Sequence, residues 1–263
     1  MVAERSIIEW NKQSPWKSLV MVEQDLILCR ALVAIYSDEF LSSRLAFRGG
    51  TAIHKLYLSP QVRYSEDIDL VQILPENIGA ILNKLREVLA FLGTPKVLVK
   101  RSNNTMVFRL NSTFPPFVPI RLKIEINCKE HFNVLGLKKI PFEIKNSWFN
   151  GNCEIVTYQL DELIGSKIRA LYQRKKGRDL FDLYKALENP NLNIENVINC
   201  FYRYISFSDG NTPSKAIYLA NMEAKMQEEI FLNDTNVLLR PEIEYNPQAA
   251  YDIVKKELIE KLR

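Results

Sequence analysis

A glycine pair followed by threonine stands in the stretch from 47 to 70, which reads FRGGTAIHKLYLSPQVRYSEDIDL. Glycine lets the backbone approach a ligand closely, and the start of a helix offers unpaired N–H groups and the positive end of the helix dipole. A triphosphate fits such a corner, with the Thr51 hydroxyl as a further donor. The alternative is that Gly49-Gly50 forms only a turn.

Two aspartates, Asp67 and Asp69, lie near the end of the same stretch. Residues 67 to 73 (DIDLVQI) alternate in character, which predicts a β-strand with both carboxylates on one face. Two like charges on one face are costly to bury without a cation. Mg²⁺ prefers hard oxygen ligands and binds one or two carboxylates together with substrate phosphates. The alternative is that both carboxylates are solvated at the edge of a loop.

A third carboxylate, Glu125, lies on the polar face of a second alternating run, RLKIEIN at 121 to 127. If this strand neighbours the strand that carries the two aspartates, Glu125 joins them in one acidic cluster. Three carboxylates beside a phosphate-binding helix start suit two-metal phosphoryl or nucleotidyl transfer. The alternative is a surface carboxylate that pairs with a lysine or arginine of its own strand.

The rest of the sequence predicts an α/β part followed by helices. Periodicity, turn residues and proline positions give the following elements: helix 14–36, a short helix from 51, strand 67–73, helix 76–92, strands 96–100, 105–110 and 121–127, and helices 160–174, 179–187 and 248–262. We therefore expect an α/β domain at 1–157 and a helical domain at 158–263.

Composition narrows the class of protein. The chain has 263 residues, of which 47% are apolar, and a net charge of +4 that is compatible with a phosphate-bearing partner without requiring one. Four widely spaced cysteines and two histidines argue against a zinc site or a disulfide framework. The N-terminus does not read as a signal peptide, and the most apolar run, 26–36, is too short to span a bilayer. We expect a cytoplasmic protein.

The stretch from Gly49 to Asp69 resembles the opening motif of the DNA polymerase β-like nucleotidyltransferase superfamily. It is most similar to the AbiEii branch, the toxins of type IV toxin–antitoxin and abortive-infection systems, which includes the MenT toxins. The matching residues are Gly49, Gly50, Thr51, Lys55, Arg63, Ser65, Asp67 and Asp69. LIGSKIRALYQR and GRDLFDLYKAL resemble the later motifs of the branch through Lys167, Arg174, Arg178, Asp179 and Asp182. The resemblance covers roughly residues 45 to 187.

The charged residues of the later motif are also suited to phosphate binding by their types and spacing. Lys167 and Arg174 are two helical turns apart, which predicts that they project from one helix face toward phosphate oxygens. Asp179 and Asp182 are three residues apart and could orient both cations. The alternative is a charged solvent face with ordinary pairing within the helix. By analogy with the branch, we expect Lys167 and one of the two aspartates, with Asp179 preferred, to be catalytic.

The resemblance implies an α+β fold: a polymerase β-like mixed sheet with flanking helices and a C-terminal helical domain that completes the NTP-binding cleft, bilobed with a central cleft. It implies a Mg²⁺-dependent toxin, with Mn²⁺ as an alternative metal, that transfers NMP from an NTP to RNA, such as the tRNA 3′ end, and inhibits growth. It also implies a cognate antitoxin. The expected metal ligands are Asp67, Asp69 and Glu125, which with Lys167 and Asp179 form the expected catalytic set. The expected NTP contacts are Gly49, Gly50, Thr51, Arg63, Ser65, Lys167, Arg174 and Asp182.

Basic residues provide candidates for an RNA-facing surface with salt-dependent binding. They are Lys100, Arg101, Arg109, Arg169, Arg174, Lys175, Lys176 and Arg178. His54 is expected on a helix surface. Alternative functions are a non-catalytic binding module with the same fold and a nucleotidyltransferase that acts on a small molecule or a protein. A nuclease is disfavoured, because Lys123 and Glu125 have K-x-E order, whereas many nucleases have E-x-K.

Overall fold

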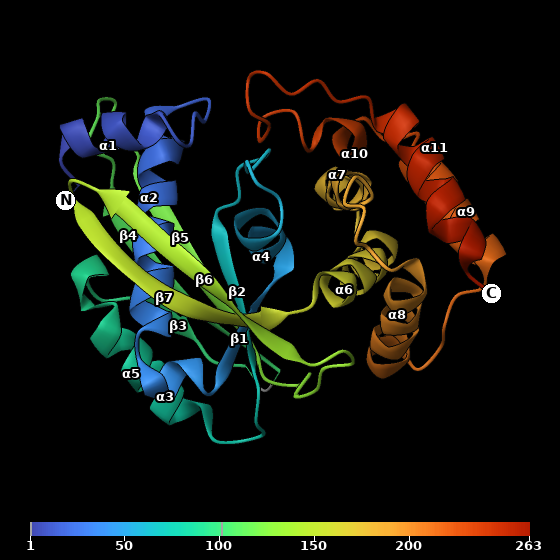
Figure 1. Cartoon of the computed structure of the whole chain (residues 1–263), viewed down its shortest axis with the longest axis horizontal. Coiled ribbons are helices and arrows are strands. Elements are labelled where there is room, and N and C mark those ends of the chain that lie inside the picture. Colours follow the sequence, from blue (N-terminus) through green and yellow to red (C-terminus); the bar gives the residue numbers. More distant parts are fainter. Residues whose placement is uncertain (1, 101) are drawn as a thin grey trace. The chain divides into compact units, whose positions relative to one another are not determined.

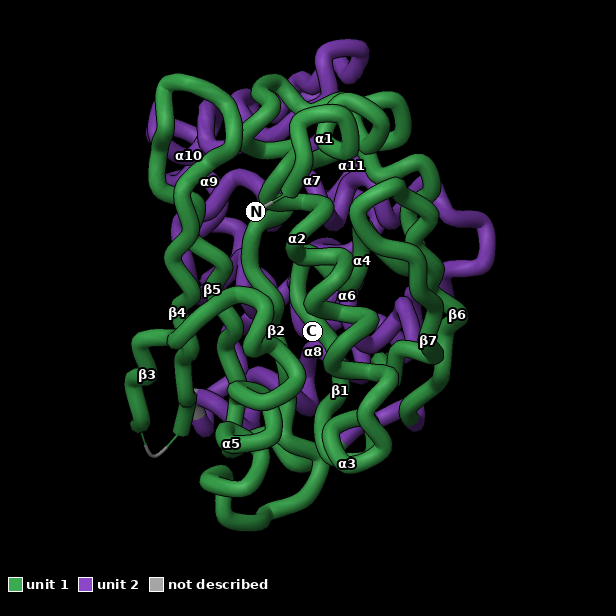
Figure 2. Tube along the Cα trace, turned by 90° about the vertical axis from the view of Figure 1, so that its left-hand side faces the viewer, with its two compact units in different colours: residues 1–132, 137–158 green, residues 133–136, 159–263 purple. Residues whose placement is uncertain are grey.

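The computed structural model describes residues 2–100 and 102–263, so the predicted RNA-facing residue Arg101 lies outside the described residues. The chain forms two compact units, which Figure 2 distinguishes by colour. Unit 1 comprises residues up to Phe132 together with Leu137–Tyr158, and unit 2 comprises Asn133–Gly136 and Gln159–Arg263.

Unit 1 is built on a mixed sheet of seven described strands in the order β3-β4-β5-β2-β1-β7-β6 (Figure 1). The strands are β1 Leu45–Arg48, β2 Asp67–Gln72, β3 Lys96–Leu98, β4 Asn103–Asn111, β5 Pro119–Asn127, β6 Leu137–Asn146 and β7 Phe149–Tyr158. The β2–β5 and β1–β7 pairs are parallel, and the other neighbours are antiparallel. The predicted hairpin of β3 and β4 is present, whereas the hairpin of β6 and β7 was not predicted.

One face of β5 is apolar and the other is open. Ile120, Leu122, Ile124 and Ile126 are buried, while the residues between them are exposed or half-buried. Helix α2 (Leu19–Tyr36) packs against β5, β6 and β7. The polar residues of β5 therefore remain available for chemistry.

The helices of unit 1 differ from the prediction at their ends. They are α1 Glu4–Asn11, α2 Leu19–Tyr36, α3 Glu39–Ser42, α4 Gly49–Leu56 and α5 Ile78–Val88, followed by a 3₁₀ turn at Ala90–Leu92. The prediction that Ser14 begins the second helix is wrong, because the Ser18 hydroxyl accepts the Met21 N–H and caps α2 there. Helix α1 was not predicted.

Unit 2 is helical, with α6 Leu160–Gln173, α7 Gly177–Ala186, α8 Ile194–Asp209, α9 Lys215–Lys225, α10 Glu229–Asn233 and α11 Pro247–Glu257, and a 3₁₀ turn at Ile259–Lys261. Helix α6 packs against α7, α8 and α9. A Cβ at Gly165 of α6 would lie 2.6 Å from the Cys200 Cβ of α8, so glycine allows this close approach. Together the two units confirm the predicted α+β class. In the described chain, no helix combines the length and the apolar character that a membrane span requires.

Candidate active site

The acidic residues of β2 and β5 are neighbours in the sheet. In the parallel register, Asp69 is paired with Glu125 and Asp67 with Lys123. Residues two apart on a strand share a face, so the three carboxylates lie on one side of two adjacent strands. The condition on which Glu125 could join the two aspartates is therefore met.

The Lys123 ammonium lies among these carboxylates. Its Nζ is 2.9 Å from Asp67 Oδ2 and 3.0 Å from Glu125 Oε1. Burial raises the pKa of Asp67 above its ordinary value, even though Lys123 acts to lower it. Burial also lowers the pKa of Lys123, but the bonds to the two carboxylates outweigh it and leave that pKa raised. The predicted alternative, a Glu125–Lys123 pair, thus occurs within the acidic cluster.

The donor set of the cluster suits a hard divalent cation, because carboxylate oxygens are the ligands that Mg²⁺ prefers. The position of the Lys123 ammonium shows that Asp67 and Glu125 can share one cation. Within residues 2–100 and 102–263, however, no three Asp, Glu, His or Cys side chains converge as a ready-made metal site. Joint binding by Asp67, Asp69 and Glu125 stays a prediction, and it requires Lys123 to release its two carboxylates.

Helix α4 begins at the glycine corner beside the cluster. Gly49 has a φ of +78°, and a Cβ there would lie 2.3 Å from Asp69 Oδ2. Glycine is therefore required both by the backbone conformation and by the carboxylate that lies against it. The N-cap residue Arg48 supplies no side-chain acceptor to the first turn. The first N–H groups of α4, those of Gly49 and Gly50 among them, can thus be offered to an anion.

The hydroxyls of Thr51 and Ser65 connect α4 to the start of β2. Thr51 Oγ1 lies 2.6 Å from Ser65 Oγ and donates to the Asp67 carbonyl oxygen at 2.5 Å. Since Thr51 is buried, its hydroxyl holds the acidic strand against the helix. Contact of either hydroxyl with a nucleotide remains a prediction.

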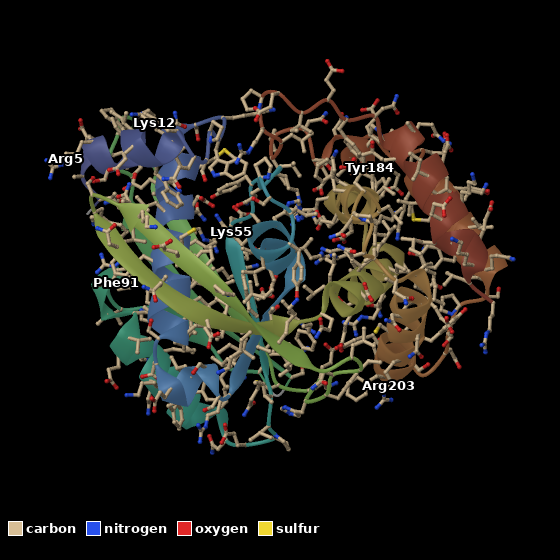
Figure 3. The ribbon with its side chains drawn as sticks, in the orientation of Figure 1. Arg5, Lys12, Lys55, Phe91, Tyr184 and Arg203 are labelled. Carbon is tan, nitrogen blue, oxygen red and sulfur yellow. The ribbon has the colours of Figure 1, made fainter. Side chains whose placement is uncertain are left out.

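Two cations of the opening motif are buried inside unit 1. Lys55, labelled in Figure 3, places its Nζ 2.5 Å from Asp25 Oδ1, and Trp10 Nε1 donates to the other oxygen of that carboxylate at 2.9 Å. Arg63 is 3% exposed and donates from Nη1 to the Tyr64 carbonyl oxygen at 2.9 Å. The motif lysine therefore ties α4 to α2, and Arg63 must move before it can meet a triphosphate.

The expectation that His54 lies on a helix surface is wrong, because the residue is 1% exposed. It is in α4, where Thr51, Ala52 and Ile53 are buried as well. When a short helix is enclosed on more than one side, the spacing of its apolar residues does not show which residues are exposed.

A pocket of about 240 Å³ opens beside Asp69 and Glu125. Its other lining residues include Arg48, Asn127 and Lys129. Arg48 is paired with Asp69 across β1 and β2 and forms an ion pair with Glu130. Sequence reasoning missed Arg48; the available signal was its position directly before Gly49-Gly50.

The predicted residues of unit 2 form a buried charge cluster. Lys167 Nζ lies 2.9 Å from Asp179 Oδ1 and 2.9 Å from Asp182 Oδ2. Arg174 binds Asp179 with two hydrogen bonds, from Nε at 2.6 Å and from Nη2 at 2.8 Å. Burial raises the pKa of Asp179, but Lys167 and Arg174 outweigh it and leave that pKa below its ordinary value. The alternative of a solvated helix face is wrong, since both aspartates are fully buried.

The prediction that Arg174 shares a helix face with Lys167 is wrong. Helix α6 ends at Gln173, and Arg174 follows in an extended conformation. The two cations meet instead through Asp179. The Arg174 side chain is 52% exposed, so the carboxylate holds a guanidinium that solvent, or an anion, can reach.

Most of the candidate RNA-facing cations of unit 2 have acidic partners. Lys175 is 2.6 Å from Glu228, and Lys176 and Arg178 lie 3.8 and 4.0 Å from Asp234. Such pairing reduces the positive field that these residues present to nucleic acid. The prediction of a basic RNA-facing surface is weaker here than on the strands of unit 1.

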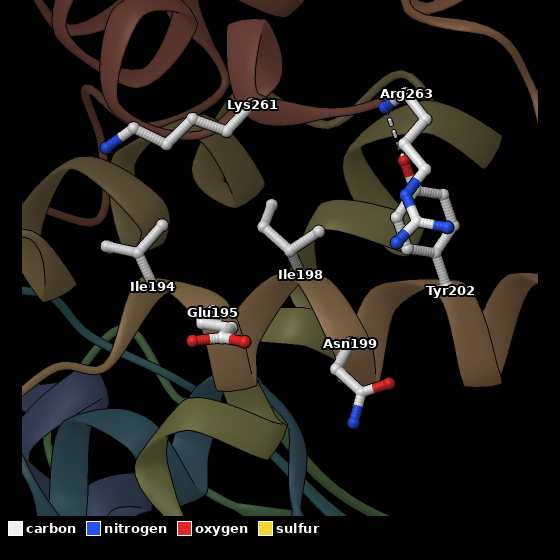
Figure 4. A pocket seen from close by; sticks show the side chains of 7 residues that line it. All are labelled: Ile194, Glu195, Ile198, Asn199, Tyr202, Lys261 and Arg263. Atoms are coloured by element: carbon white, nitrogen blue, oxygen red, sulfur yellow. Dashed lines mark hydrogen bonds between the residues drawn. The ribbon is translucent and has the colours of Figure 1, made fainter.

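A second pocket, of about 620 Å³, lies in unit 2 between α8 and the last residues of the chain (Figure 4). It is lined by Ile194, Glu195, Ile198, Asn199, Tyr202, Lys261 and Arg263. These residues belong to none of the predicted motifs, so the pocket does not enter the candidate active site.

Comparisons with known proteins place this geometry in context. The model of the AbiEii nucleotidyl transferase toxin family, type IV toxin–antitoxin system, matches residues 30–261. MenT4, a nucleotidyltransferase toxin from Mycobacterium tuberculosis, is similar in structure with a TM-score of 0.67 and 16% identity, over 98% of this chain and 88% of MenT4. A protein from H. pylori titled as a nucleotidyltransferase gives a TM-score of 0.50 at 16% identity, over 92% of this chain and 97% of that one. At these identities the structural likeness shows the fold. Among curated proteins, none matches the chain significantly.

Proposed function

The chain belongs to the AbiEii nucleotidyltransferase toxin family of type IV toxin–antitoxin systems, and we propose that it transfers NMP from an NTP to a hydroxyl of RNA. The observation that carries this proposal is the register of β2 and β5, which puts Asp69 beside Glu125 with Asp67 on the same face. Next to them, the start of α4 offers backbone N–H groups for phosphate oxygens.

The proposed reaction is a single displacement at the α-phosphorus of the NTP. The acceptor hydroxyl oxygen forms a bond to this phosphorus, the bond between the α-phosphorus and the bridging oxygen breaks, and pyrophosphate leaves. Glu125 takes up the hydroxyl proton, because it lines the open pocket beside Asp69. A divalent cation bound by Asp67, Asp69 and Glu125 would neutralise the phosphate charge and lower the pKa of the attacking hydroxyl.

The unit 2 cluster is proposed to bind phosphate as well. Arg174 presents a half-exposed guanidinium that the buried carboxylate of Asp179 fixes in place with two hydrogen bonds. A planar guanidinium held in this way suits phosphate oxygens. Lys167 is held by Asp179 and Asp182, and its role in the reaction is part of the same proposal.

The proposal extends to the biological role. The acceptor is RNA such as the tRNA 3′ end, modification inhibits growth, and a cognate antitoxin is encoded with the toxin. The reaction takes place in the cytoplasm. Membership of a type IV toxin–antitoxin family supports this role.

Label transfer tests the proposed reaction. The protein is incubated with total RNA, Mg²⁺ and each of the four NTPs, labelled in parallel at the α- or the γ-phosphate. We expect α-label in RNA with at least one NTP, γ-label in pyrophosphate, and loss of both with EDTA. Absence of transfer with every NTP would favour a binding module, and label in protein or in a small molecule would select a different acceptor.

A further inference from the structure

The open face of the β4–β5 ribbon carries two arginines directly opposite each other. Arg109 and Arg121 are partners in the antiparallel register, and both are exposed. Like charges at directly opposed positions destabilise a strand pair. Within the described part of the chain, neither guanidinium forms an ion pair with a carboxylate. An anionic ligand would supply the charge that this pair lacks.

The arginine pair shares its face with the acidic cluster. Arg121 and Glu125 are four residues apart on β5, so their side chains point to the same side, roughly 13 Å apart along the strand at about 3.3 Å per residue. Lys123 lies between them. Basic side chains thus continue along one strand up to the carboxylates of the proposed reaction, with Lys123 paired to Asp67 and Glu125 at the near end.

An exposed aromatic side chain lies just before these basic residues. Phe117, in the loop between β4 and β5, is 70% exposed. The loop is fixed, because Thr113 donates from its backbone N at 2.8 Å and from Oγ1 at 2.7 Å to the buried carboxylate of Glu23. Further along, the Val118 N–H donates to Ser112 Oγ at 2.9 Å. The ring is therefore presented to solvent on an anchored loop.

We propose that this face binds the single-stranded 3′ segment of the acceptor RNA. Arg109 and Arg121 hold backbone phosphates, Phe117 stacks on an unpaired base, and the terminal hydroxyl points toward Glu125. The charges complement a phosphate backbone, and stacking on an aromatic ring requires a base that is not paired. This inference rests on the proposed function and adds the residues that receive the acceptor.

Binding can be measured without chemistry, by fluorescence anisotropy of a short single-stranded RNA, labelled at its 5′ end, at several salt concentrations and without NTP. The test variant is Arg109→Ala/Arg121→Ala. The matched control is Lys139→Ala/Lys145→Ala, which removes two exposed cations from β6 of the same sheet. Thermal unfolding checks that each variant is folded, and loss of the opposed arginines is expected to leave the melting temperature unchanged or higher.

We expect the arginine variant to bind RNA at least tenfold more weakly than the control. Its plot of log K against log salt should become shallower by roughly 1.4 in slope, because two phosphate contacts are lost and each contact to a single strand contributes about 0.7. Phe117→Ala should weaken binding roughly tenfold with the slope unchanged, because a stacked base releases no counterions. Equal binding and equal slopes in the arginine variant and the control would overturn the proposal, as would the absence of RNA binding by the native protein.

The two proposals fail in different ways. If the native protein binds RNA through the two arginines but transfers no NMP, the proposed function is wrong and the binding surface stands. If the protein labels RNA and the arginine variant binds and labels it as well as the control does, the acceptor lies elsewhere and the reaction stands.

Discussion

Replacing Gly49 by alanine tests how the glycine corner and the acidic cluster are connected. The added Cβ would lie 2.3 Å from Asp69 Oδ2, whereas an ordinary contact begins at 3.4 Å, so the carboxylate must retreat by about 1 Å. A displacement of about 1 Å at a reacting group costs on the order of 100-fold in rate. The positive φ of Gly49 adds about 1–3 kcal/mol of strain once a side chain is present.

Gly93→Ala is the matched control for this substitution. Gly93 lies in the same unit with a φ of +82°, and a Cβ there meets no atom within 4 Å. Urea denaturation should show a loss of about 1–3 kcal/mol of unfolding free energy in both variants, because a side chain strains the backbone at a positive φ. The label-transfer assay should show a roughly 100-fold lower kcat for Gly49→Ala alone. Native activity in Gly49→Ala, or an equal loss in Gly93→Ala, would refute the argument that the clash with Asp69 matters.

Three further predictions concern charges. Lys55→Met should destabilise the protein by about 3 kcal/mol or more in urea, because it leaves the buried Asp25 carboxylate without its ammonium partner; an unchanged midpoint would contradict a structural role. Asp179→Asn should lower the free energy of unfolding by about 3 kcal/mol at pH 7. The difference in stability from the native protein should shrink as the pH falls below 3.8 and through the lowered pKa of Asp179, because the stabilisation exists only while the folded-state carboxylate is ionised. An equal difference in stability at pH 7 and pH 3 would contradict a stabilising role of the ionised Asp179 carboxylate. The Lys123→Met variant should bind Mg²⁺ roughly tenfold more tightly than the native protein in a thermal-shift titration. The reason is that two half-exposed ion pairs of up to about 1 kcal/mol each no longer compete with the metal for the carboxylates. Weaker binding would show that Lys123 does not compete.

The acidic face could be predicted because its strands alternate in character. In β2, Ile68 and Leu70 are buried between the aspartates, and in β5 the isoleucines on either side of Glu125 are buried. Alternation fixes which side chains share a face, but it does not decide which strands become neighbours. The pairing of β2 with β5 joins residues 56 positions apart, such as Asp69 and Glu125, and it is supplied by the tertiary fold.

Contacts between distant segments explain what the sequence did not reveal. Helix α2 buries Glu23 and Asp25, whose partners Thr113 and Lys55 lie 90 and 30 positions away. Charged residues within an apolar run do not identify such partners. Strand β6 was missed because its residues are mostly exposed or half-buried and include Pro141, a pattern typical of an edge strand.

Glu125→Gln tests whether the carboxylates of two adjacent strands carry out nucleotidyl transfer. Its control is Glu143→Gln, which changes a more exposed strand glutamate of the same sheet. Glu143 is 2.9 Å from Lys145, much as Glu125 is 3.0 Å from Lys123. The measurement is the rate of α-label transfer from NTP to RNA in the presence of Mg²⁺. We expect a loss of at least 100-fold for Glu125→Gln, within the range for removal of a general base, and native activity for Glu143→Gln. Native activity in Glu125→Gln would show that this carboxylate does not take part in the transfer.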